Sequence, residues 1–74
     1  MTKTYDVAVV GATGTVGEAM LEILEQREFP VGRIFALASE RSAGKRVRFR
    51  DKSVSVADVA DFDFSRVQLA LFAV

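Results

Sequence analysis

Three glycines at three-residue spacing, Gly11, Gly14 and Gly17, separate two segments with different hydrophobic periods. The segment before them, residues 5–10, is a short apolar run rich in valine, which is typical of a strand buried on both faces of a parallel sheet. After the glycines, apolar residues recur at the helical period. A glycine turn between a buried strand and a helix is how a βαβ unit opens, so the chain is predicted to be an α/β protein with a parallel sheet.

The helix is predicted to begin at Val16 and to end by about Glu28, because Pro30 disfavours helical geometry at the residue before it. Its apolar face is expected to consist of Val16, Met20, Ile23 and Leu24. A second apolar run of strand length follows at residues 34–38. Strand, glycine turn, helix and strand thus fit the length of one βαβ unit.

Residues 46–56 alternate between apolar and polar side chains, which predicts a half-exposed hairpin. We place its turn at Asp51-Lys52. The alternating apolar residues are Val47, Phe49, Val54 and Val56.

Residues 58–65 are ambiguous, with a short helical turn as one interpretation, and the apolar run 67–74 is predicted to re-enter the sheet. The expected architecture is therefore β-α-β, hairpin and β. We expect the downstream portion of the sheet to be missing, because a loop that faces the ligand should follow the last strand.

The 74 residues suffice for one small domain, with ten basic and ten acidic side chains. Without Cys or His, the chain carries no disulfide, thiol nucleophile, imidazole base or ordinary zinc site. No apolar run approaches the roughly 20 residues of a membrane span, and we expect a cytoplasmic protein with no membrane partner. The basic residues within 41–52 alternate toward water without stacking aromatics beside them, so we expect no nucleic-acid partner.

The glycine turn has the features that a dinucleotide pyrophosphate needs. Gly11 can make the tight turn, Gly14 can admit the phosphate, and Gly17 can let helix and strand pack closely. Thr13 and Thr15 add hydroxyls that can cap the helix or contact phosphate, and the helix start carries partial positive charge. No Lys-Ser or Lys-Thr follows the glycines, which excludes a Walker A loop. Nucleotide binding is favoured over a turn that is only structural.

The end of the second predicted strand should lie beside the adenosine ribose. Glu40 can accept a hydrogen bond from a 2′-hydroxyl, as the acid of an NAD-specific fold does. Arg41, with the hydroxyls of Ser39 and Ser42, can instead hold a 2′-phosphate by charge-assisted hydrogen bonds. We predict NADP rather than NAD, and a polar loop in solvent is the structural alternative.

Three stretches, residues 11–17, 29–31 and 37–45, closely resemble the amino-terminal part of bacterial aspartate-semialdehyde dehydrogenases. They read Gly-Ala-Thr-Gly-Thr-Val-Gly, Phe-Pro-Val and Leu-Ala-Ser-Glu-Arg-Ser-Ala-Gly-Lys. The resemblance covers nearly the whole chain. It implies that residues 1–74 are the first part of a Rossmann-like NAD(P)-binding domain. Thr13 to Val16 would contact the dinucleotide phosphates, and Ser39, Arg41 and Ser42 would surround the 2′-phosphate.

The resemblance also implies an activity for the parent protein. This activity is the phosphate-dependent, NADPH-linked interconversion of L-aspartate 4-semialdehyde and L-4-aspartyl phosphate, on the route to lysine, methionine and threonine. Members of the family use a cysteine nucleophile and a histidine acid/base. They form homodimers. That machinery is expected downstream, in a catalytic and dimerisation domain, so no catalytic residue is assigned here and the 74-residue piece is expected to be inactive alone.

The chain departs from the family pattern at Phe72-Ala73-Val74, where the family has small residues leading to a glycine pair. Two alternatives therefore stay open: a non-catalytic paralogue that uses the fold for binding or assembly, and an atypical short-chain NADPH reductase. A downstream cysteine followed by a histidine would favour the dehydrogenase. A missing cysteine would favour the paralogue, and a Tyr-x-x-x-Lys motif would favour the reductase.

Overall fold

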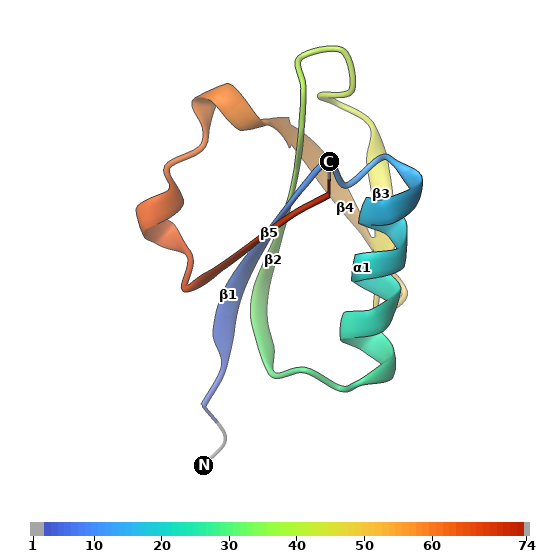
Figure 1. Ribbon diagram of the computed structural model, residues 1–74, viewed down its shortest axis with the longest axis vertical. Coiled ribbons are helices and arrows are strands. Elements are labelled where there is room, and N and C mark those ends of the chain that lie inside the picture. The colour runs from blue at the N-terminus through green and yellow to red at the C-terminus, as the bar shows by residue number, and fades with distance from the viewer. Residues whose placement is uncertain (1–2, 74) are drawn as a thin grey trace.

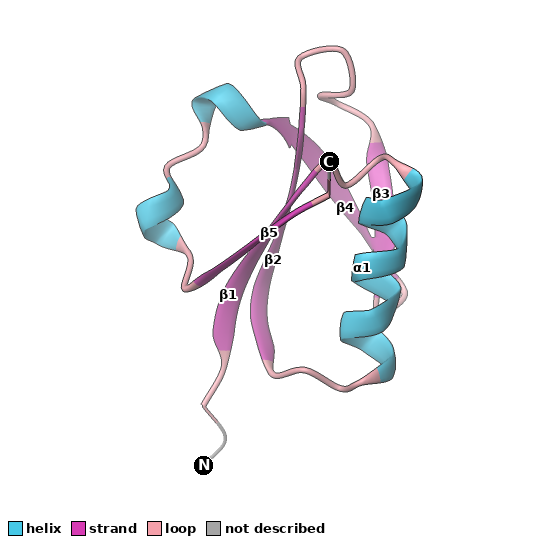
Figure 2. Ribbon diagram, viewed as in Figure 1, coloured by secondary structure: helices cyan, strands magenta, loops and turns pink. Residues whose placement is uncertain are grey.

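The computed structural model describes residues 3–73, which form a five-stranded sheet with one helix on one face (Figure 1 and Figure 2). The elements in chain order are β1 (Tyr5–Val10), α1 (Thr15–Gln26), β2 (Val31–Ala38), β3 (Arg46–Phe49), β4 (Lys52–Asp58), the 3₁₀ helices η1 (Val59–Asp61) and η2 (Phe64–Arg66), and β5 (Leu69–Phe72).

The strand order is β3-β4-β2-β1-β5, and all neighbours are parallel except the antiparallel pair β3 and β4. The four parallel strands β4, β2, β1 and β5 stand in the order 3-2-1-4 that opens a doubly wound dinucleotide-binding sheet. The predicted partial Rossmann-like α/β fold is confirmed, with β3 as an additional antiparallel edge strand.

The main core lies between α1 and the sheet. Val7 and Val9 of β1 are fully buried there, and Leu21 and Leu24 of α1 are nearly so. Ala8 is also fully buried, on the opposite face, because successive strand side chains alternate between the two faces. Burial on both faces explains why residues 5–10 read as a continuous apolar run.

The inward face of α1 differs from the expected one. Val16 and Ile23 are 54% and 50% exposed, and Met20 is half-buried, so three of the four predicted core positions are wrong or only partly correct. The buried helix residues are Gly17, Leu21 and Leu24. A Cβ at position 17 would overlap the backbone of the glycine turn, so the helix is rotated to bring Gly17, and not Val16, against Gly11 and Ala12.

The predicted hairpin is present, but its turn is one residue earlier than expected. Phe49 pairs with Lys52, which leaves Arg50 and Asp51 as the two-residue loop. Both have positive φ, 50° and 62°, as a type I′ turn requires. Arg50 offsets the poor turn sequence: its backbone N–H donates to Glu25, and its guanidinium Nη2 donates to the carbonyl of Phe29 at 2.6 Å.

The second arm of the hairpin also joins the main sheet, because β4 pairs in parallel with β2 through Ala36 and Val56. The second predicted strand begins earlier than expected, at Val31 instead of Ile34, and ends at Ala38 as predicted. The apolar run 67–74 re-enters the sheet as β5 beside β1, although Val74 lies outside the described residues.

The ambiguous segment 58–65 forms η1 and η2, each with an aspartate N-cap. Asp58 accepts from the N–H of Ala60 at 2.9 Å, and Asp63 accepts from the N–H of Ser65 at 3.0 Å. Hydrogen bonds from the hydroxyl and the N–H of Ser65 lower the pKa of Asp63 below its ordinary value.

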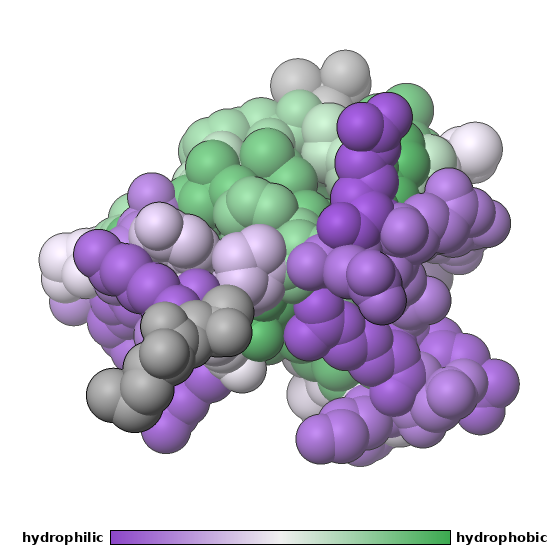
Figure 3. All heavy atoms as spheres, turned by 90° about the horizontal axis from the view of Figure 1, so that it is seen from below, coloured by the Kyte–Doolittle hydropathy of each residue, from purple (hydrophilic) through white to green (hydrophobic). Residues whose placement is uncertain are grey.

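This segment crosses the face opposite α1, where four phenylalanine rings pack in a chain. Phe35 lies 5.1 Å from Phe62, and Phe64 lies 5.1 Å from Phe62 and 6.0 Å from Phe72, measured between ring centroids. Seen from the amino ends of the parallel strands, apolar residues gather on one side and hydrophilic residues cover the other (Figure 3). None of the helices formed by residues 3–73 is long and apolar enough to cross a membrane.

Replacing Asp51 by Gly should stabilise the protein, because glycine adopts the positive φ of a type I′ turn without the steric cost that aspartate bears there. We expect the free energy of unfolding to rise by about 0.5 to 1 kcal/mol. Chemical denaturation measures the change. Lys52→Gly, one residue later in the extended strand, should lower stability, and an equal loss in both variants would contradict the turn assignment.

Candidate functional site

Two loops far apart in the sequence meet at the carboxyl ends of β1 and β2. The N–H groups of Gly11 and Ala12 donate to the carbonyl of Leu37 at 2.8 and 3.1 Å, which ties the glycine turn to the end of β2. The segment 39–45 leaves β2 one residue later. Figure 1 shows the start of α1 at the same end of the sheet. In open α/β sheets, ligands bind in the crevice outside the carboxyl ends of the strands.

The start of α1 carries free hydrogen-bond donors. Gly14 is the N-cap, and no side chain caps the helix. The first helical hydrogen bond runs from the N–H of Glu18 to the carbonyl of Gly14 at 2.9 Å. The N–H groups of Thr15, Val16 and Gly17 therefore have no acceptor among residues 3–73. Three free amides and the positive end of the helix dipole are the features that favour an anion at a helix start.

The absence of a side-chain cap also bears on the two threonines. The sequence allowed Thr13 and Thr15 either to cap the helix or to contact a phosphate. Neither hydroxyl caps it in the structure, and Thr15 is exposed while Thr13 is half-buried beside the turn. The capping role is thus absent from the structure, and contact of the two hydroxyls with a ligand stays a prediction.

The three glycines meet different demands. Gly11 has a φ of +85°, and a Cβ there would overlap the carbonyl oxygen of Ala73. Gly17 packs against the backbone of Gly11 and Ala12 with no room for a Cβ. Gly14 has a φ of −84°, and the nearest atom to a Cβ there would be the carbonyl oxygen of Gly11 at 3.5 Å, an ordinary contact. The fold thus requires glycine at positions 11 and 17, whereas position 14 is free for a ligand to approach.

The loop after β2 is a compact turn in which the carbonyl of Ser39 accepts from the N–H of Ser42 at 2.9 Å. The N–H of Gly44 donates to the carbonyl of Val56 at 2.8 Å, which ties the end of the loop to β4. Ser39 and Arg41 are exposed and Ser42 is half-buried, so the structure brings the three predicted residues into one turn beside the glycine loop. Glu40 is exposed as well. The backbone of the turn therefore fits both a 2′-hydroxyl bound by Glu40 and a 2′-phosphate bound by Arg41.

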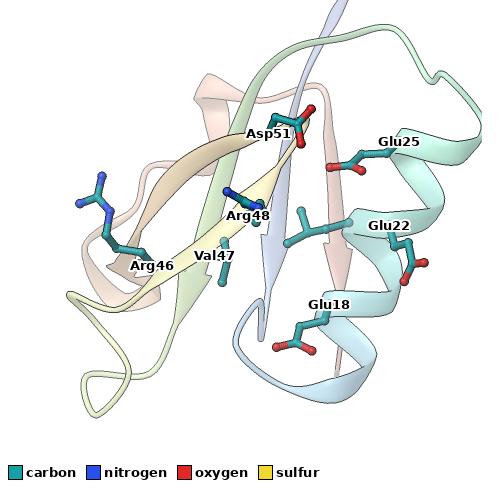
Figure 4. A pocket seen from close by; sticks show the side chains of 8 residues that line it. Glu18, Glu22, Glu25, Arg46, Val47, Arg48 and Asp51 are labelled. Atoms are coloured by element: carbon teal, nitrogen blue, oxygen red, sulfur yellow. The ribbon is translucent and has the colours of Figure 1, made fainter.

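A groove on the helix side of the sheet lies away from these loops. It measures about 490 Å³ and runs between α1 and the edge strand β3, over Leu21 and Val47. Glu18, Glu22 and Glu25 line its helix side, whereas Arg46 is directed away from the helix (Figure 4). Apart from the neighbouring start of α1, it shares nothing with the two loops.

A second cavity of about 300 Å³ lies on the opposite face, between β2, β4 and the η1–η2 segment. It reaches Asp58, the last residue of β4. Asp58 is not among the residues that the sequence predicts to bind a ligand. In the sequence, Asp58 is an acidic residue that follows a segment of alternating apolar and polar residues. Its position becomes informative only once β4 is known to lie beside β2.

Comparison with known proteins identifies the family. Residues 6–74 match the family model described as semialdehyde dehydrogenase, NAD binding domain. The chain belongs to the semialdehyde dehydrogenase family. The description names an NAD binding domain, which confirms the predicted nicotinamide dinucleotide cofactor at the level of NAD or NADP.

Similar proteins include the aspartate-semialdehyde dehydrogenase of Vibrio mimicus, 56% identical over 99% of this chain and 23% of that protein. A USG-1 protein homolog of Azotobacter vinelandii is 52% identical over 99% of this chain and 22% of its own length. The crystal structure of aspartate semialdehyde dehydrogenase II from Vibrio cholerae, complexed with ASA, superposes with a TM-score of 0.93 at 56% identity. It is matched over 97% of this chain and 24% of the crystallised one. The chain thus spans less than a quarter of the length of these relatives.

The different demands on the glycines lead to a prediction. Gly14→Ala should change the free energy of unfolding by less than about 1 kcal/mol, yet weaken NADPH binding at least tenfold, or about 1.4 kcal/mol, because the added methyl group occupies the phosphate approach. Gly17→Ala should cost about 2 kcal/mol of stability through overlap with the turn. Thermal unfolding and NADPH titration of both variants measure the two effects. Unchanged NADPH affinity in Gly14→Ala would contradict the assignment.

Proposed function

We propose that residues 1–74 are the amino-terminal part of the NADP-binding domain of a phosphate-dependent semialdehyde dehydrogenase. The observation that carries this proposal is the pairing of three free helix amides with an arginine-bearing turn at adjacent strand ends. The level of identity to proteins named aspartate-semialdehyde dehydrogenase supports it. The catalytic and dimerisation domain would then belong to the remainder of a longer protein.

In this proposal the first turn of α1 binds the pyrophosphate. The N–H groups of Thr15, Val16 and Gly17 donate to phosphate oxygens, Thr13 adds its hydroxyl, and Gly14 leaves room for the approach. Gly11 contributes the turn that directs the chain into the helix. These contacts fix the cofactor at the strand ends without any charged side chain.

The turn after β2 binds the 2′-phosphate. Arg41 offers its guanidinium fork, and Ser39 and Ser42 offer hydroxyls from the same turn. The exposure of Arg41 leaves its side chain available to an incoming ligand. NADP is therefore the proposed cofactor, and its nicotinamide exchanges a hydride with the substrate when it is bound.

The proposed reaction converts L-aspartate 4-semialdehyde, phosphate and NADP+ into L-4-aspartyl phosphate and NADPH. It would serve lysine, methionine and threonine biosynthesis in the cytoplasm, in a homodimer. This chain has neither Cys nor His, so the thiol nucleophile and the imidazole base of such a reaction must come from other residues. The role of the present residues is to hold and orient the cofactor, and the piece alone should be inactive.

A second candidate is a paralogue that keeps the fold without the dehydrogenase chemistry. The specific support is the similarity to proteins named USG-1 protein homolog from Azotobacter vinelandii and Pseudomonas aeruginosa, at 52% and 53% identity. These values lie within the range of 44% to 56% identity to proteins named aspartate-semialdehyde dehydrogenase, and the name states no reaction. The presence or absence of a downstream cysteine, together with an activity measurement, separates the two candidates.

The intact protein should reduce NADP+ when given L-aspartate 4-semialdehyde, and only when inorganic phosphate is present, because phosphate must attack the acyl intermediate. Absorbance of NADPH follows the reaction, with reactions lacking phosphate or aldehyde as controls. Binding of NADPH without turnover would favour the paralogue. Turnover that is independent of phosphate would contradict the proposed reaction.

Arg41→Ala should weaken NADPH far more than NADH, because only NADPH carries the 2′-phosphate. Loss of one charge-assisted contact corresponds to about 1.5 to 3 kcal/mol, or roughly 10- to 150-fold in affinity. Titration of the intact protein with both cofactors measures the ratio. Arg48→Ala, an equal charge change at an exposed position of β3, is the control and should leave the ratio unchanged. Equal losses for both cofactors in Arg41→Ala would refute the role of the arginine.

A further inference from the structure

β3 forms one outer edge of the sheet, because within the described residues it pairs with β4 alone. In an antiparallel pair, successive residues direct their backbone groups alternately toward the partner strand and away from it. Phe49 pairs with Lys52 to close the two-residue loop, so the backbone groups of Phe49 point toward β4. By this alternation, the N–H and C=O groups of Arg46 and Arg48 point outward. They form an open edge with which a further strand can pair.

The open edge borders the groove of about 490 Å³ between β3 and α1. At the hairpin end this groove is closed, because the backbone N–H of Arg50 donates to the carboxylate of Glu25. Figure 4 shows the strand and the helix diverging from that end toward Arg46 and Glu18. A segment of chain can therefore enter the groove from its wide end and lie along the unpaired part of β3.

The sheet face that points away from α1 is basic beside the open edge. Arg46 lies on this face, where its Nε donates to the hydroxyl of Ser53 at 2.6 Å and its Nη1 to that of Ser55 at 3.3 Å. Arg48 shares the face, because side chains two residues apart in a strand point the same way. Both arginines are exposed. The two hydroxyls hold one guanidinium in position and leave both positive charges open to a partner.

The helix side of the groove is acidic above an apolar floor. Glu18 and Glu22 are exposed and line the groove from α1. Leu21 is nearly fully buried and Val47 is half-buried beneath them. A lysine or arginine side chain fits such a surface, because its methylene stem covers apolar groups while its charged end reaches a carboxylate.

These two faces define the segment that the edge accepts. Side chains of an added strand alternate between the same two faces as those of β3. The residues opposite Arg46 and Arg48 lie on the basic face and suit carboxylates, since opposite charges across a strand pair are stabilising. The residue between them lies beside Val47 on the helix side and suits a lysine or arginine. The edge therefore selects an acidic-basic-acidic triplet.

A second copy of this chain does not fit that pattern. Pairing of β3 with β3 of another copy would set Arg46 and Arg48 against the same arginines, and like charges directly opposite each other are destabilising. The sequence of residues 1–74 contains no basic residue that is flanked on both sides by acidic ones. The occupant that the charges favour is thus a segment of different sequence.

We propose that the groove between α1 and β3 is a docking site for an extended segment of a partner protein with an acidic-basic-acidic triplet. The segment joins the sheet as an additional strand beside β3, a mode in which backbone hydrogen bonds give affinity and alternate side chains give specificity. This inference goes beyond the proposed function and does not depend on the cofactor, because the groove lies away from the two loops at the carboxyl ends of β1 and β2.

The first test uses a fluorescein-labelled peptide, Thr-Val-Glu-Lys-Glu-Val-Thr, in which the valines and the lysine share one face of the extended chain. Fluorescence anisotropy measures its binding to the intact protein. We expect the protein to bind this peptide at least about tenfold more tightly than the charge-reversed peptide Thr-Val-Lys-Glu-Lys-Val-Thr, because the reversed peptide sets like charges together on both faces. Equal affinity for the two peptides would overturn the proposal.

N-methylated peptides distinguish strand pairing from attraction between charges alone. In the proposed register the N–H groups of the two glutamates point toward β3, whereas that of the lysine points away. Methylation of both glutamate nitrogens should weaken binding roughly tenfold, because two backbone hydrogen bonds are lost while every charge is kept. Methylation of the lysine nitrogen should have little effect. Equal losses from the two modifications would contradict strand pairing.

Variants of the intact protein locate the site. Arg46→Glu and Glu22→Lys should each weaken the Glu-Lys-Glu peptide roughly three- to tenfold, and the double variant should prefer the charge-reversed peptide. Arg33→Glu makes the same charge change at an exposed position of β2 outside the groove and is the control. An equal loss in the control, or no binding of the peptide to the wild-type intact protein, would overturn the assignment.

Discussion

The contact between Gly17 and the backbone of Gly11 and Ala12 is the constraint on which the arrangement of the helix depends. No Cβ fits between these segments, so α1 begins directly above the end of β1. This closeness fixes the rotation of the helix and turns Leu21 and Leu24 into the core, leaving Val16 and Ile23 exposed. It also sets the free amides of the first turn beside the strand ends, where an anion can meet them.

The two ends of the sheet differ in how far their hydrogen-bond donors are paired within the chain. At the amino end, the loops are held by the chain itself: Arg50 donates to the carbonyl of Phe29, and Asp6 accepts from the N–H of Arg33 at 2.9 Å. At the carboxyl end, the backbone is anchored by Leu37, but the helix amides and Arg41 remain without a partner among the described residues. The donors that the fold leaves unused thus gather at the carboxyl end, which is the edge predicted to bind the cofactor.

The hairpin links these two ends. Its tight turn is held against the connection between α1 and β2, and its second arm runs back beside β2 to the binding edge. Asp58 lies at the carboxyl end of the parallel strands because β4 is parallel to β2. A segment whose sequence predicts a half-exposed hairpin thus also supplies a wall of the second cavity.

The sequence by itself determined most of the element types and the position of the two loops that follow β1 and β2, because their signals are local. The buried first strand, the glycine turn and the break before Pro30 each follow from steric limits within a few residues. The loop at residues 39–42 could be selected because its residue types match a phosphate, and its function stays a prediction. The resemblance to the family was likewise recognisable from short sequence motifs.

Tertiary structure decided what depends on contacts between distant segments. Helix periodicity fits more than one rotation, and the Gly17 contact selected the one that buries Leu21. The hairpin turn lies at Arg50-Asp51, and not at the predicted Asp51-Lys52, because pairing of Phe49 with Lys52 sets the register. Residue types alone leave this register open. The place of β4 beside β2, and with it the position of Asp58, is likewise a nonlocal pairing that no local pattern encodes.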